Sequence, residues 1–168
     1  HFPRVFKLFK FMPFRRVFFE KNQPVHIISR AVIDIFKQKE DCYRFIFQFY
    51  VTNLGKRGFN VSAKNAIKAG RALLRGEEIP PKFVVKEHPP IVHLLDFSLV
   101  MNHNHFYLLP NSDNAIPIFM QKLNSGFAQS FNLLHKRKDA VFGRRYGSVI
   151  VKDEPQSYAV SRYVSVIN

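Results

Sequence analysis

The stretch from Phe97 to Leu109 reads FSLVMNHNHFYLL, and the interpretation of the whole chain depends on it. β-branched, aromatic and Leu residues dominate this stretch, which predicts a buried or half-buried strand. Alternate residues of a strand project from the same face, so His103 and His105 are expected to point the same way. Neutral imidazoles at this spacing can share one divalent metal ion, and they suit Mn, Zn, Fe or Ni better than Mg. Such a pair also arises by chance in a chain with seven His, so spacing alone leaves a structural role open.

The chain is strongly basic, with 26 Lys and Arg against 12 Asp and Glu in 168 residues and a net charge of +14. This length predicts one domain with an appended arm or an insertion. The charge predicts a polyanionic partner, with nucleic acid ahead of an anionic membrane. The single cysteine, Cys42, excludes an internal disulfide framework and is compatible with a reducing compartment. No apolar run reaches the roughly 18 residues of a membrane-spanning helix, so we expect no membrane partner.

Residues 1–24 form a basic segment in which Phe residues alternate with Lys and Arg. One interpretation is an N-terminal arm that lies on a phosphate backbone or stacks on bases. The other is a basic surface segment that packs on the domain. The segment lacks the small-residue cleavage site of a secretory signal, and it lacks an initiator Met, as in a fragment of a longer protein.

The first half of the domain is predicted to begin with a strand over 25–33, which follows Pro24 and is rich in Val and Ile. Apolar residues at helical spacing then predict a helix over 41–54, with Asp41 as its N-cap and Gly55 and Gly58 as stops. Residues 59–90 have the composition of an insertion. They are expected to hold a helix over 63–75, capped by Ser62 and ended by Gly76, and then a proline-rich loop with at most a short edge strand.

The second half of the domain is predicted to contain strands over 92–100 and 102–109, a turn, and a long amphipathic helix over 115–136. A basic run follows this helix, and strand-like residues lie within 141–151. The basic run is either a solvated loop or a phosphate-contacting hairpin, and the net charge favours the hairpin. Asp153-Glu154-Pro155-Gln156 has the pattern of a helix start, with Asp153 as the N-cap.

These landmarks stand in an order that resembles the HUH-type single-tyrosine transposases, in particular the REP-associated tyrosine transposase branch. The matching segments lie within 22–168 and are Asn102-His103-Asn104-His105, Phe119-Met120-Gln121-Lys122-Leu123, Phe131-Asn132, Phe142-Gly143-Arg144-Arg145-Tyr146 and Arg162-Tyr163-Val164. The strand that begins at Val25-His26-Ile27 also resembles the first strand of that family. The chain departs from the family pattern at Asn104, where an apolar residue is usual, and at Ile167, where a polar residue can complete the metal shell. These departures indicate a diverged copy.

The resemblance implies an α+β fold, a ferredoxin-like sandwich with an antiparallel sheet and helices on one face. It divides the chain into a basic arm, 1–24, and an HUH transposase-like catalytic domain, 25–168, with 59–90 as the insertion. It implies a transposase, a metal-dependent endonuclease and strand transferase, that cleaves and rejoins single-stranded or hairpin DNA in the cytoplasm, associated with the nucleoid. Some branches of the family are dimeric and others monomeric.

The resemblance also implies the site. Tyr163 is the expected nucleophile, and it forms a 5′-phosphotyrosine intermediate. His103 and His105 are the expected ligands of a divalent metal ion, Mg²⁺ or Mn²⁺, which acts as a Lewis acid on the scissile phosphate. The basic residues that we expect to contact DNA are Arg15, Arg16, Arg30, Lys136, Arg137, Lys138, Arg144 and Arg145.

Other interpretations stay open at this point. One is a domesticated, catalytically inactive module that holds a DNA or RNA hairpin, and the substitutions at Asn104 and Ile167 motivate it. A zinc hydrolase is disfavoured because no third His, Cys or carboxylate lies at ligand spacing. Tyr107, Tyr146 and Tyr158 are alternative nucleophiles, and Tyr107 could instead support a metal ligand because it lies two residues after His105. The remaining histidines, His26, His88, His93 and His135, are assigned structural or surface roles.

Overall fold

The computed structural model describes residues 17–55, 59–84, 88–153 and 155–157. The elements of the described residues, in chain order, are β1 (Val25–Arg30), α1 (Lys39–Asn53), α2 (Lys64–Arg75), the 3₁₀ turn η2 (Pro81–Phe83), β2 (Val92–Val100), β3 (His103–Pro110), α3 (Ala115–Leu134) and β4 (Gly147–Ile150). The four strands pair antiparallel in the order β2-β3-β1-β4. Apart from α2, this is the βαββαβ arrangement of a ferredoxin-like sandwich, so the predicted fold class is confirmed.

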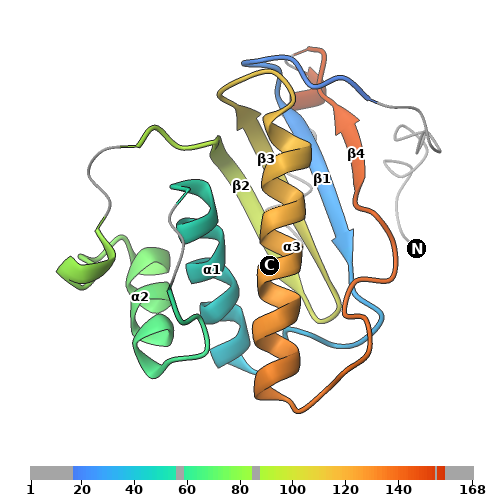
Figure 1. Cartoon of the computed structure of the whole chain (residues 1–168). Helices are drawn as coiled ribbons and strands as arrows, with labels where there is room; N and C mark the ends of the chain where they lie inside the picture. Colours follow the sequence, from blue (N-terminus) through green and yellow to red (C-terminus); the bar gives the residue numbers. More distant parts are fainter. Residues whose placement is uncertain (1–16, 56–58, 85–87, 154, 158–168) are drawn as a thin grey trace.

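One face of the sheet is covered by α1 and α3, as Figure 1 shows. The covered face carries the alternate apolar residues of the strands, such as Ile27, which is paired with Phe106. The core between sheet and helices is completed by buried residues of α1 and α3, including Phe45, Phe49, Ile116, Phe119, Leu123 and Phe127. The apolar face of the strands, which repeats every two residues, therefore packs against the apolar face of α3, which repeats every 3.6 residues, as expected for an α+β sandwich.

Helix α1 has two apolar faces, and each packs against a different partner. Phe45 and Phe49 face the sheet and α3, whereas Phe47 and Val51 lie in a second cluster with residues of α2. That second cluster also contains Ala66, Ala69 and Phe83. The insertion is thus attached to the outside of α1, as Figure 1 shows, and α1 lies between α2 and the rest of the domain.

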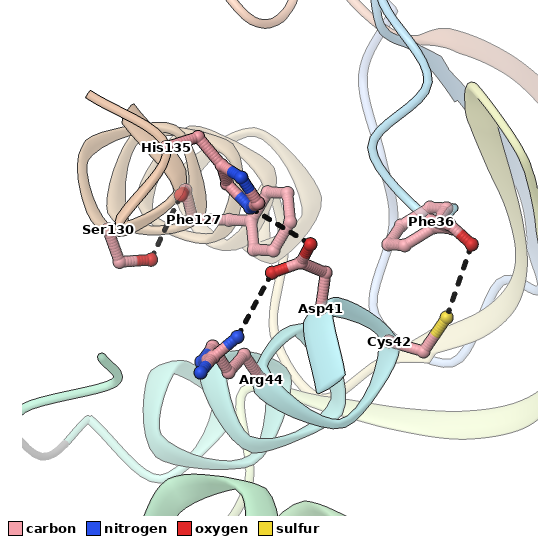
Figure 2. Close-up of polar contacts among 7 residues, drawn as sticks. All are labelled: Phe36, Asp41, Cys42, Arg44, Phe127, Ser130 and His135. Atoms are coloured by element: carbon pink, nitrogen blue, oxygen red, sulfur yellow. Dashed lines mark hydrogen bonds and ion pairs between the residues drawn. The ribbon is translucent and has the colours of Figure 1, made fainter. Parts of the chain in front are cut away.

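The predicted N-cap of α1 is wrong, because the helix begins at Lys39 and Gln38 occupies the cap position. Asp41 lies in the first helical turn and is 2% exposed. Its Oδ1 accepts a hydrogen bond from Arg44 Nη1 at 3.2 Å, and its Oδ2 lies 3.0 Å from His135 Nε2 beyond the end of α3 (Figure 2). The carboxylate therefore joins the start of α1 to the end of α3, a long-range contact that the local sequence does not reveal.

The insertion contains a helix at the predicted place. Helix α2 begins one residue later than predicted, and Ala63, not Ser62, occupies its N-cap position. The predicted stop is confirmed, because Gly76 takes the left-handed conformation with φ of +65° and ends the helix. No strand forms in 59–84 or 88–90, the described part of the insertion, where the proline-rich stretch contributes only the turn η2.

The end of the described chain differs from the predicted strand over 141–151. Only Gly147–Ile150 pairs with β1, and Phe142 forms an isolated bridge with Ala31. After β4, Asp153 Oδ1 accepts a hydrogen bond from the backbone N–H of Gln156 at 2.8 Å, so Asp153 caps the following turn as predicted. None of the helices in the described ranges has the length and apolar character to cross a membrane.

Candidate functional site

His103 and His105 lie on the face of the sheet opposite the helices. Ser29 pairs with Asn104 in the register, and Ser29 Oγ accepts a hydrogen bond from Asn124 on α3, which places Ser29 and Asn104 on the helix side. The two histidines alternate with Asn104 and therefore project from the other face. Their ring centroids are 5.1 Å apart. His105 is buried, whereas His103, at the start of β3, is half-buried.

His26 is a third histidine at this site, and the sequence had suggested only a structural or surface role for it. Its Nε2 lies 3.2 Å from His105 Nδ1, and the two rings are stacked with centroids 5.4 Å apart. His26 comes from β1, the neighbour of β3, and is 2% exposed. The available signal was a histidine in the first strand, but its proximity to His105 depends on the strand register, which the sequence did not specify.

The hydrogen bonds of these rings favour one nitrogen as a metal ligand. His103 Nδ1 lies 2.9 Å from Asn102 Oδ1, and an amide oxygen only accepts, so Nδ1–H donates and Nε2 keeps its lone pair. If His105 Nδ1–H donates to His26 Nε2, His105 is left in the same tautomer. In both histidines Nε2 is then the nitrogen that would bind a metal.

The site favours neutral imidazoles. Burial lowers the pKa of His26 to about 4. Burial, followed by the positive charges of His26, His103 and Arg30, lowers the pKa of His105 to about 3. Burial and the neighbouring Arg30 also lower the pKa of His103. Neutral imidazole is the form that binds metal ions, so the three rings have the protonation state that a metal site needs near neutral pH.

The described residues provide only some of the ligands that a metal site needs. His103 and His105 provide two imidazoles on one face, and each has a partner on Nδ1 that orients the ring. Among the described residues, however, no group of three His, Cys, Asp or Glu side chains is arranged to hold a metal ion. A divalent ion bound here would take its remaining ligands from water, from DNA oxygens or from residues outside the described ranges.

The predicted nucleophile, Tyr163, lies outside the described residues, but the turn that leads toward it is described. The hydroxyl groups of Tyr107 and Ser157 are hydrogen-bonded at 2.5 Å. Tyr107 lies on the same face as His105, two residues further along β3. The chain is thus held against the histidine face six positions before Tyr163. Of the alternative nucleophiles, Tyr158 is also outside the described ranges, and Tyr146 is half-buried with a pKa raised by burial.

The predicted DNA-contacting residues that are described come together at one end of the molecule. Arg30 ends β1, is exposed and pairs in register with His103. Arg144 and Arg145 are exposed in the segment just before β4, whose first residue, Gly147, pairs with Ile28 near the end of β1. The loop that joins α3 to β4, with Lys136, Arg137 and Lys138, crosses the same end of the sheet (Figure 1). Arg15 and Arg16 lie outside the described residues.

A groove of about 540 Å³ lies on the helix side, away from the histidines. Its walls come from α1, α3 and the chain after α1, and include Gln48, Thr52 and Gln129. Because the sheet and its core separate the groove from His103 and His105, it does not form part of the site described above.

Comparison with known proteins places the fold. No protein-family model matches the sequence, and no curated protein matches it. A solved structure of a REP-associated tyrosine transposase bound to a REP hairpin is similar, with a TM-score of 0.52 and 10% sequence identity. The match covers 92% of this chain and 71% of the transposase chain. At this identity the likeness is one of fold, and the chain has an α+β fold similar to that of this hairpin-bound transposase.

Proposed function

We propose that this protein cleaves and rejoins single-stranded or hairpin DNA, with Tyr163 as the nucleophile and His103 and His105 as ligands of Mg²⁺ or Mn²⁺. The observation that carries the proposal is the pair of neutral, oriented imidazoles on the sheet face opposite α1 and α3, at the end where Arg30 and the basic loop lie. The similar solved structure, a transposase bound to a DNA hairpin, supports the choice of reaction and partner.

The proposed reaction is a transesterification. The phenol oxygen of Tyr163 attacks the scissile phosphorus, the bond from phosphorus to the 3′ oxygen breaks, and the 3′ oxygen takes up a proton. The products are a 5′-phosphotyrosine and a free 3′-OH, and attack by a 3′-OH reverses the step to rejoin DNA. A bound divalent ion would supply Lewis acidity at the scissile phosphate. Arg30 and the loop arginines would contact phosphates and position the strand.

The departure at Asn104 bears on stability more than on this chemistry. Asn104 is completely buried on the helix side, and its amide atoms have no hydrogen-bond partner within the described ranges. An unpaired buried amide lowers stability, but this side chain lies across the sheet from the histidines. The substitution therefore leaves the proposed ligands in place.

A second candidate function is hairpin binding without cleavage. The observation that favours it is the absence of a three-residue metal group from the part of the chain that the structure describes. An oligonucleotide assay separates the two functions. With Mn²⁺ or Mg²⁺, a hairpin substrate with a single-stranded flank should yield a covalent adduct with the wild type and none with Tyr163→Phe.

Tyr146→Phe is the matched control, and it should retain the adduct. An adduct that survives in Tyr163→Phe but disappears in Tyr146→Phe would assign the nucleophile to Tyr146. Hairpin binding without any adduct in the wild type would favour the binding module.

A further inference from the structure

Helix α2 carries a cationic stripe that the proposed site does not use. Four basic residues lie at positions i, i+4, i+7 and i+11 of the helix, and all are exposed: Lys64, Lys68, Arg71 and Arg75. At 3.6 residues per turn these positions fall on one narrow face, about 16 Å long. The helix contains no Asp or Glu. We name these four residues the α2 stripe.

The stripe faces solvent, and one of its members, Arg71, also contacts α1. The residues of α2 that pack on α1 are small and buried, namely Ala66, Ala69, Gly70 and Ala72. With 3.6 residues in a turn, Ala66, Ala69 and Gly70 lie on the opposite side of the helix from the stripe, and Ala72 lies at its flank. A Cβ atom at Gly70 would collide with the backbone of Tyr43, so the two helices approach closely at this point. The packing therefore fixes the orientation of α2 and presents the stripe to solvent.

The stripe is unfavourable for the isolated helix. Lys64 and Lys68, and Arg71 and Arg75, are like-charged neighbours four residues apart, an arrangement that destabilises helices. Lys64 is also in the first helical turn, where the helix dipole disfavours a positive charge. A solvated helix face ordinarily mixes acids with bases at this spacing. A bound polyanion would offset the repulsion.

Most of these charges are available for an external anion. Arg75 lies 3.7 Å from Glu77, an exposed pair. Among the described residues, no carboxylate forms an ion pair with Lys64, Lys68 or Arg71. The Arg71 guanidinium lies over the ring of Tyr43, 5.2 Å from its centroid, which restrains the side chain without neutralising it.

We propose that the α2 stripe binds the phosphate backbone of a DNA duplex, in a contact separate from the strand held at the histidines. The exposed face of α2 has no aromatic residue on which an unpaired base could stack, so it is suited to phosphates and carries little sequence information. A membrane fits less well, because a helix that lies in a membrane inserts a broad apolar face, and Leu74 is the one exposed apolar residue of α2.

The contact is separate because α1 lies between α2 and the sheet, as Figure 1 shows, while His103 is on the sheet face opposite α1 and α3. The inference rests on the proposed function only for the choice of DNA as the polyanion.

The test is a salt titration of DNA binding with the full chain and the variant Lys64→Gln/Lys68→Gln/Arg71→Gln. Gln keeps a high helix propensity and removes the charge. Each phosphate contact on a duplex contributes about 0.9 to the slope of log K against log salt, so the variant should lose about 2.7 from that slope. Between 50 and 200 mM salt, the wild-type affinity should then fall about 40-fold more than that of the variant. The probes are a hairpin and a plain duplex of the same stem length.

The matched control is Lys82→Gln/Lys122→Gln/Lys152→Gln, which removes the same charge from exposed lysines outside α2. An equal loss of slope in this control, or an unchanged slope in the α2 variant, overturns the inference. A wild type that binds neither probe overturns both this inference and the proposed function. Duplex binding that depends on α2, without a covalent adduct, supports the inference and counts against the cleavage reaction. Stripe-dependent binding to anionic vesicles without stripe-dependent duplex binding would assign the surface to a membrane.

Discussion

Replacing Asp41 by Ala should destabilise the protein strongly, although the residue lies far from the histidines. The carboxylate is 2% exposed, and it holds Arg44 at 3.2 Å and His135 at 3.0 Å. The Arg44 side chain is 14% exposed, and its buried Nε has no hydrogen-bond partner among the described residues. The His135 side chain is 29% exposed and can turn toward water. The substitution thus leaves one cation largely buried without its partner.

The expected loss follows from these exposures. Breaking a buried ion pair by removing one partner costs about 3–5 kcal/mol. Because His135 can recover hydration, we expect the lower end, about 3 kcal/mol. An acidic residue in the first turn of a helix contributes a further 0.3–1 kcal/mol or so through the helix dipole. For a domain of this length, a total of about 3.3–4 kcal/mol lowers the Tm by about 7–16 °C.

The assay is urea unfolding of the wild type, Asp41→Ala and Glu40→Ala, followed by circular dichroism. Glu40 is the matched control because it is an exposed acid in the same helical turn. Glu40→Ala should lower the free energy of unfolding only by the contribution of the helix dipole, below about 1 kcal/mol. Equal losses in the two variants would refute the argument that the Asp41 network joins α1 to α3.

Three further predictions concern the site and the insertion. Replacing Arg144 and Arg145 by Ala should weaken single-strand binding across sequences and reduce the slope of log K against log salt by about 1 to 1.5. His103→Ala should abolish cleavage and leave this slope unchanged. A salt titration in which the arginine variant keeps the wild-type slope would show that this segment does not contact DNA. His26→Ala should weaken Mn²⁺ binding about 10- to 100-fold because His105 loses its orienting partner. Calorimetric titration should show partial recovery of the affinity in His26→Gln and no change in the exposed control His93→Ala. Wild-type affinity in His26→Ala would contradict the orienting role of His26. Gly70→Ala should lower the free energy of unfolding in urea by about 1–3 kcal/mol or more, because the new methyl group collides with the backbone of Tyr43. Gly126→Ala should lower it less, because its methyl group contacts the movable end of the Gln48 side chain. Equal losses in the two variants would mean that α2 can shift without penalty.

The sequence by itself determined the features that depend on local periodicity. The alternation of β3 put His103 and His105 on one face, and the spacing of apolar residues located α3 to within two residues at its C-terminal end. The positive-φ preference of glycine located the end of α2 at Gly76. Each of these patterns arises within a few residues of the chain, so it can be read without knowing what packs against it.

Only the tertiary structure decided the partners of these residues. His26 meets His105 because β1 pairs with β3 in a particular register, and Asp41 meets His135 because the start of α1 lies beside the end of α3. From its local sequence Asp41 has the features of an N-cap, and His26 those of an ordinary strand histidine. Register and helix packing are set by the total apolar area that the sheet and helices bury together, a quantity that no short segment of the sequence contains.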